Sequence, residues 1–185
     1  MAEVGKKNVK KTYVPCSLLG RTEDRLWKLD VAPANIYVAA TIHNQVAALR
    51  FALQLQDAGF CVTSNWLRKD FSCLPNPEND WPDYKALMEK MGRVDCADLE
   101  RSDTLIIIAD MPSATGGFHV ELGYFLGAKR TNIIVVGGVR PNVFYWTDSV
   151  RWTRNTDGLI EWLLDSAHGK VEGPPSTQFA EEIAF

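Results

Sequence analysis

The chain has 185 residues, of which 46% are hydrophobic, and a formal net charge of −3, a composition that supports one globular domain rather than a disordered chain. No apolar run reaches the roughly 18 to 20 residues of a membrane span, and the N-terminal lysines precede no apolar signal segment. Residues 1–30 carry seven Lys/Arg against four Asp/Glu, and the remainder carries thirteen against nineteen, so we expect no membrane and no polymeric nucleic acid as partner.

Apolar runs of strand length alternate along the chain with stretches of helical period. An N-terminal extension over residues 1–34 comes before them, and a tail over 169–185 follows the expected domain at 35–168. The expected strands are 36–40, 60–63, 104–109, 133–136 and 143–145. The expected helices are 44–58, 84–101, 118–128 and 158–167, and the prolines within 67–82 predict a loop.

The first expected helix has an apolar stripe of Val46, Leu49 and Leu53 and ends at Gly59. Strands that alternate with helices, several of them apolar throughout, are typical of a parallel sheet covered on both faces. We therefore expect an α/β fold: a flavodoxin-like (Rossmann-like), doubly wound, parallel five-stranded sheet in the order 2-1-3-4-5. Such sheets bind ligands at the switch point, beyond the carboxyl ends of strands 1 and 3.

The loops that leave those two strands hold the most informative residues of the chain. Residues 110–117 are rich in hydroxyls and glycine, with Ser113, Thr115, Gly116 and Gly117 ahead of a helix whose first turn we expect to carry Glu121. Backbone N–H groups at such a helix start favour an anionic or sugar-like ligand. A carboxylate there is either a nucleophile or base, or an ordinary acidic residue that the helix dipole favours.

Other polar residues fall near the same edge of the expected sheet. Asp95 and Asp98 share a helix face, where they supply a second carboxylate or are merely solvated. Tyr37 is a core aromatic or a group that orients a carboxylate, and Asn65 and Trp66 follow strand 2 as a stacking wall or as packing. Thr41 and His43, which lie in the loop after strand 1, complete the expected substrate contacts.

The remaining patterns point away from metals and cofactors. His43 and His119 are too isolated for a metal site, so we expect no metal and no cofactor. The four cysteines form no C-x-x-C pair, which favours free thiols and a cytoplasmic location.

Three segments carry a resemblance to a known family: Ile36-Tyr37-Val38-Ala39, Asp98-Leu99-Glu100-x-x-Asp103 and Thr115-Gly116-Gly117-x-x-Val120-Glu121-Leu122-Gly123-Tyr124. Between residues 35 and 165 the chain resembles the nucleoside 2-deoxyribosyltransferase superfamily, which includes deoxynucleoside 5′-monophosphate N-glycosidases and pyrimidine nucleotide hydrolases. The resemblance implies a retaining, double-displacement cleavage of an N-glycosidic bond, with water or a second base as acceptor. It also implies a homodimer or larger homo-oligomer.

The same resemblance implies roles for particular residues. Glu121 matches the nucleophile, Tyr37 the tyrosine that holds it, and Asp98 the aspartate that contacts the base and helps to protonate it. Thr115 stands where transferases carry an aspartate and nucleotide hydrolases a serine, so a 5′-monophosphate is the expected preference over the free nucleoside. The alternatives are a non-catalytic nucleotide sensor on the same scaffold and another chemistry on this fold, such as NAD glycohydrolysis.

Overall fold

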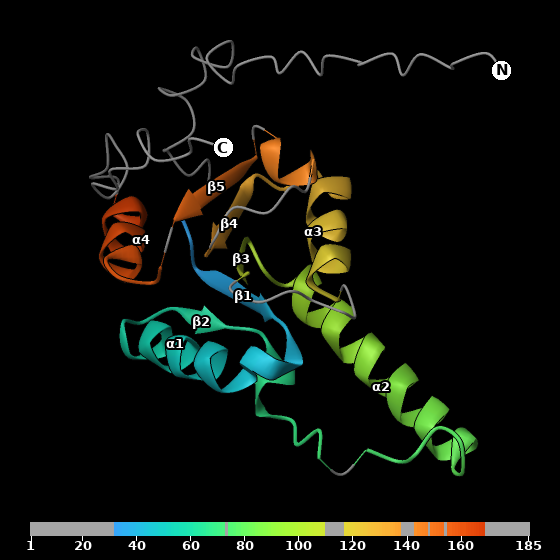
Figure 1. Ribbon diagram of the computed structural model, residues 1–185. Coiled ribbons are helices and arrows are strands. Elements are labelled where there is room, and N and C mark those ends of the chain that lie inside the picture. The colour runs from blue at the N-terminus through green and yellow to red at the C-terminus, as the bar shows by residue number, and fades with distance from the viewer. Residues whose placement is uncertain are drawn as a thin grey trace, which may run out of the picture.

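A computed structural model of the chain describes residues 32–72, 74–109, 117–137, 143–147, 149–153 and 155–168 (Figure 1). The strands are β1 (Asn35–Ala40), β2 (Cys61–Val62), β3 (Thr104–Ile108), β4 (Asn132–Val136) and β5 (Val150–Thr153). The α-helices are α1 (Gln45–Asp57), α2 (Trp81–Glu100), α3 (Gly117–Gly127) and α4 (Leu159–Ala167). Short 3-10 helices are η2 (Ile42–Asn44), η3 (Asn65–Arg68) and η4 (Val143–Trp146).

The sheet confirms the expected architecture. All described strand pairs are parallel, and the order is β2-β1-β3-β4-β5. In Figure 1, α1 and α4 lie on one side of the sheet, and α2 and α3 lie on the other. The register pairs Ala40 with Ile108, so the carboxyl ends of β1 and β3 meet at one edge. The fold is therefore α/β and doubly wound, with its switch point between β1 and β3.

The two central strands are buried along their whole length, which follows from helices covering both faces. Every residue of β3 and of β4 is buried, and their apolar side chains form the middle of the core. Helix α3 contacts β1 and β3, and α2 contacts α3, so both helices meet over the same face of the sheet. This arrangement brings side chains of β1, α2 and α3 together beneath the switch point.

The expected stripe on the first helix was wrong in its register. Leu49 is partly buried and packs against the core, but Val46 is 64% exposed and Leu53 is also exposed. The residues that α1 buries are Ala48, Phe51, Ala52 and Leu55. Small alanines at two of these positions allow α1 to lie close to β1 and β2. Alanine carries a weak hydrophobic signal, so a search for large apolar residues selected the wrong face of the helix.

The expected fifth strand at 143–145 was also wrong, because this segment forms the 3-10 helix η4 and the strand follows at Val150–Thr153. Aromatic residues favour strands, but here they form a short turn before β5. Helix α2 begins at Trp81, three residues earlier than expected, because Pro82 lies in its first turn, where its missing N–H breaks no helical hydrogen bond.

Most of the expected extension and tail lies outside the described residues, so the boundaries at 34 and 168 remain predictions. Within the ranges that the structure describes, no helix combines the length and the apolar character that crossing a bilayer requires.

Candidate active site

A tyrosine and a glutamate from two different elements meet under the carboxyl edge of the sheet. Tyr37 lies in the middle of β1, fully buried, and its hydroxyl donates a long 3.5 Å hydrogen bond to Oε1 of Glu121 on α3. Helix α3 begins at Gly117, which places Glu121 in the second helical turn. The expected first-turn position was therefore wrong, and the preference of acidic residues for a helix N-terminus does not account for this carboxylate.

The surroundings of Glu121 favour its protonated form. Burial is the main cause that raises the pKa of Glu121 to about 7, and the nearby Asp95 carboxylate raises it further. Hydrogen bonds from the backbone and from Tyr37 act in the opposite direction. The second oxygen, Oε2, is buried and has no hydrogen-bond partner among the described residues. A carboxylate in this state is costly to the fold unless a ligand completes it.

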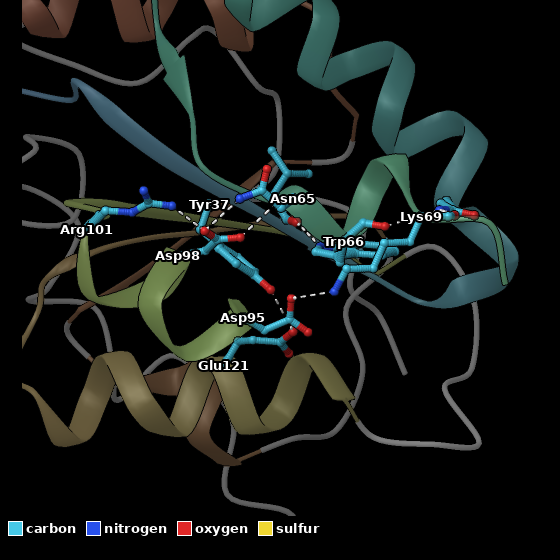
Figure 2. A network of polar contacts seen from close by, with 10 residues as sticks. Tyr37, Asn65, Trp66, Lys69, Asp95, Asp98, Arg101 and Glu121 are labelled. Atoms are coloured by element: carbon cyan, nitrogen blue, oxygen red, sulfur yellow. Dashed lines mark hydrogen bonds and ion pairs between the residues drawn. The ribbon is translucent and has the colours of Figure 1, made fainter. Parts of the chain in front are cut away.

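A second carboxylate faces the first from α2. Figure 2 shows Tyr37, Asp95 and Glu121 converging from β1, α2 and α3. Asp95 is half-buried, and burial raises its pKa, while the ammonium group of Lys69 acts to lower it. Its Oδ1 lies 3.6 Å from Lys69 Nζ, too far for a hydrogen bond, and neither atom has a hydrogen-bond partner among the described residues.

Asp98, one turn further along α2, has different surroundings. It is 1% exposed, and its carboxylate accepts hydrogen bonds from the backbone N–H of Asn65 at 3.0 Å and from Asn65 Nδ2 at 2.9 Å. The guanidinium of Arg101 also donates to Oδ1. Asp98 thus fastens the start of η3 to α2, and Asn65, expected to bind substrate, uses its side-chain amide nitrogen in this contact.

Trp66 belongs to the core, so the packing interpretation is the one that its surroundings support. It is 7% exposed, and its indole N–H donates to the carbonyl of Val38 at 2.9 Å. This bond fixes η3 against β1.

The residues expected in the two switch-point loops are described only in part. Thr41 follows β1, is 5% exposed, and its hydroxyl has no hydrogen-bond partner among the described residues. His43 is exposed in η2, and Gly117 is the exposed first residue of α3. Ser113, Thr115 and Gly116 lie outside the described residues, so the expected anion-binding loop stays a prediction.

A groove of about 280 Å³ lies between α2 and the turn that follows η3. Most of its lining is apolar; the lining residues are Lys69, Asp70, Phe71, Leu87, Lys90, Met91 and Val94. Lys69, which contacts Asp95, is the residue that the groove shares with the carboxylate site. In the described parts of the chain, no three His, Cys, Asp or Glu side chains lie close enough to hold a metal ion.

Sequence reasoning missed Lys69 and Gln45, which both help to form this site. Lys69 falls in a stretch that reads as loop, and Gln45 opens a helix. The one available signal was topological, since both residues follow the carboxyl ends of strands 1 and 2, at the edge where the fold class binds its ligand, and nothing in the local sequence marks either of them.

Among solved structures, the fold is similar to that of a 2-deoxyribosyltransferase. The 2-deoxyribosyltransferase of the psychrotolerant bacterium Bacillus psychrosaccharolyticus, described as a biocatalyst for the synthesis of nucleosides, aligns over 69% of this chain and 90% of its own, at 20% identity and a TM-score of 0.51. A conserved protein from Enterococcus faecalis V583 aligns over 72% of this chain and 99% of its own, at 13% identity and a TM-score of 0.48. No protein-family model and no curated protein matches the sequence. The chain thus has a nucleoside 2-deoxyribosyltransferase-like fold, as the resemblance of its motifs implies.

Proposed function

We propose that this protein cleaves the N-glycosidic bond of a 2′-deoxynucleoside or its 5′-monophosphate through a covalent glycosyl–Glu121 intermediate. The observation that carries the proposal is the Glu121–Asp95 pair, which presents two carboxylates of raised proton affinity at the switch point of the sheet, each with a buried oxygen that accepts no hydrogen bond among the described residues. Paired carboxylates with different tasks are what a retaining glycosyl transfer requires.

In the first step, ionised Glu121 attacks C1′ of the sugar while the bond from C1′ to the base nitrogen breaks. The positive charge that develops on the sugar ring is stabilised by the adjacent carboxylate. Tyr37 donates its hydrogen bond to Glu121 Oε1 and so restricts the direction in which the carboxylate points. The other oxygen, Oε2, has no hydrogen bond to another described residue that would have to break, so we assign the attack to this oxygen.

The departing base needs a proton, and Asp95 is the carboxyl group that we assign to deliver it. General acid assistance of this kind contributes about 10²- to 10⁴-fold to a rate. The sequence resemblance gives this role to Asp98, but the Asp98 carboxylate already accepts hydrogen bonds from Asn65 of η3 and from Arg101. Asp95 faces Glu121, and its Oδ1 accepts no hydrogen bond among the described residues, so its surroundings support the assignment better.

In the second step, water or a second base attacks C1′ and releases Glu121. When water is the acceptor, the Asp95 carboxylate takes the proton that the water loses, which restores the starting protonation state. When a base is the acceptor, its ring nitrogen forms the new bond and its proton goes to Asp95. We place the base in the groove lined by Lys69 and Val94, because Lys69 contacts Asp95 and most of the groove lining is apolar.

The test is product analysis with a panel of 2′-deoxynucleosides and their 5′-monophosphates, each with and without a free acceptor base. Release of free base and sugar supports a hydrolase, and a new nucleoside supports a transferase. Calorimetric titration of a nucleoside and its monophosphate then tests the expected phosphate preference, with Thr115→Asp as the variant that should reverse it. Binding without any turnover would favour the nucleotide-sensor alternative. The absence of both binding and turnover would refute the proposal.

A further inference from the structure

The turn that carries Lys69 is held in place by partly buried hydrogen bonds from two helices. Gln45, at the start of α1, donates through Nε2 to the backbone carbonyls of Trp66 at 3.3 Å, Leu67 at 3.1 Å and Lys69 at 2.7 Å. At the other end of η3, Asp98 of α2 accepts the backbone N–H of Asn65. Because hydrogen bonds from both α1 and α2 hold this turn, the packing of the two helices fixes the position of the Lys69 backbone.

From this turn the Lys69 side chain reaches Asp95 (Figure 2). Its ammonium lies 3.6 Å from Asp95 Oδ1, the two side chains are 26% and 30% exposed, and the two atoms themselves are inaccessible to solvent. The other titratable groups that face Asp95 are Glu121 from α3, Tyr37 from β1 and Asp98 from its own helix. Lys69 is thus the one cation in this group of described residues.

We propose that Lys69 is a positioning residue that controls the proton which Asp95 delivers to the leaving base. This inference rests on the proposed function and extends it to a residue that does not contact the reacting atoms. When Asp95 gives up its proton, the bond from Asp95 Oδ to hydrogen breaks and the bond from the base nitrogen to hydrogen forms. The carboxylate left behind is paired with Lys69, which makes the transfer more favourable.

The contact with Lys69 has two opposing consequences for the pH range of activity. An opposite charge within about 4 to 6 Å favours the ionised form of a carboxyl group, so Lys69 makes Asp95 a stronger acid and a better proton donor. The same interaction lowers the pH at which Asp95 loses its proton. Without Lys69, Asp95 should keep its proton to higher pH but should be a weaker proton donor to poor leaving bases.

The experiment compares pH profiles of kcat/KM for wild type, Lys69→Met, Lys69→Arg and Lys85→Met. Lys85 is the matched control, because it forms an exposed ion pair with Glu89 on the same helix, 2.7 Å long, away from the site. We expect Lys69→Met to move the limb of the profile that reports Asp95 upward by about one pH unit or more. Lys69→Arg and Lys85→Met should leave the limb in place. An unmoved limb in Lys69→Met would overturn the proposal.

A second measurement keeps this inference separate from the proposed function. Carbon-13 NMR of aspartate carboxyl groups follows the Asp95 titration directly, in a Glu121→Gln background, with Asp95→Asn used to assign the signal. We expect Asp95 to titrate at higher pH in Lys69→Met than in its parent. If no substrate is turned over but this shift is present, the proposed function fails and Lys69 still controls the proton on Asp95. If turnover is normal and the shift is absent, the role given to Lys69 is wrong.

Discussion

Asp95 and Asp98 lie one turn apart on the same face of α2, yet their surroundings differ in kind. Asp98 is almost fully buried, and its carboxylate accepts hydrogen bonds from Asn65 and Arg101. Asp95 is less buried, but it faces Glu121 and Lys69 with an inaccessible oxygen that has no hydrogen-bond partner among the described residues. The more buried of the two is therefore the better satisfied one.

The difference shows why burial alone does not identify a functional carboxylate. A buried charge that is fully hydrogen-bonded stabilises its surroundings, and removing it leaves donors without partners. A buried charge that lacks partners destabilises the fold and is retained for another reason. We therefore assign stability to Asp98 and chemistry to Asp95 and Glu121, and the substitutions below test this division.

The largest effect is expected at Glu121. Glu121→Gln and Glu121→Ala should each lower the rate of N-glycosidic cleavage by at least about 10³-fold, because neither side chain can form the glycosyl ester. Circular dichroism should show an intact fold. A variant that keeps a tenth of the wild-type rate would mean that Glu121 is not the nucleophile.

Asp95→Asn should come next, with a rate loss of about 10²- to 10⁴-fold that is greatest for substrates with poor leaving bases. An activated nucleoside with a good leaving group should recover most of the rate, because its base departs without a proton. Urea unfolding should show little loss of stability. An equal loss for both kinds of substrate would argue against proton delivery by Asp95.

Asp98→Ala should show the opposite pattern. It leaves the backbone N–H of Asn65 without a partner, and we expect the free energy of unfolding to fall by about 3 kcal/mol. The rate per folded molecule should change less than in Asp95→Asn. If Asp98→Ala is as stable as wild type and its activity is abolished, the assignments of the two aspartates must be exchanged.

The pH dependence of stability gives a fourth test. The pKa of Glu121 is about 7 in the folded protein against an ordinary value of 4.5, so the folded state binds this proton more tightly than the unfolded state. The free energy of unfolding should therefore fall as pH rises from about 4.5 to 7. Glu121→Gln should be more stable than wild type above pH 7, by up to about 3 kcal/mol, and equal to it near pH 4. Equal stabilities at both pH values would show that Glu121 titrates normally.

Tyr37→Phe should have the smallest effect. The Tyr37 hydroxyl lowers the pKa of Glu121 through a long hydrogen bond, so its removal should move the limb of the kcat/KM profile that reports Glu121 upward by a fraction of a pH unit. The rate at high pH should fall by less than about tenfold. A downward shift of the limb would be inconsistent with the hydrogen bond described here.

The architecture could be predicted from sequence because it depends on long-range apolar pattern. The runs at β1, β3 and β4 and the alternation with helices were sufficient for the strand order. The buried face of α1 was predicted wrongly because Ala48 and Ala52 form part of it. The segment of η4 was predicted as a strand because aromatic residues are typical of strands. In both cases tertiary packing outweighed local preference.

The candidate site could be predicted only in outline. Glu121 and Tyr37 were found because motif and topology pointed to one place, and the structure brings these two together. The two aspartates could not be distinguished, since their spacing puts both on one helix face and the distinction depends on which one meets Asn65. Lys69 had no local signal, because its position depends on Gln45 and η3.

The most direct test of the central claim is to trap the covalent intermediate. Wild-type protein is mixed with a 2′-deoxy-2′-fluoroarabino nucleoside, whose fluorine slows release of the sugar, and intact-protein mass is measured after denaturation, followed by peptide mapping. We predict a mass increase of one fluorinated sugar that maps to Glu121, is present in Asp98→Asn and is absent in Glu121→Gln. Turnover of the natural substrate without any adduct, or an adduct on another residue, would contradict the assignment of Glu121 as the nucleophile.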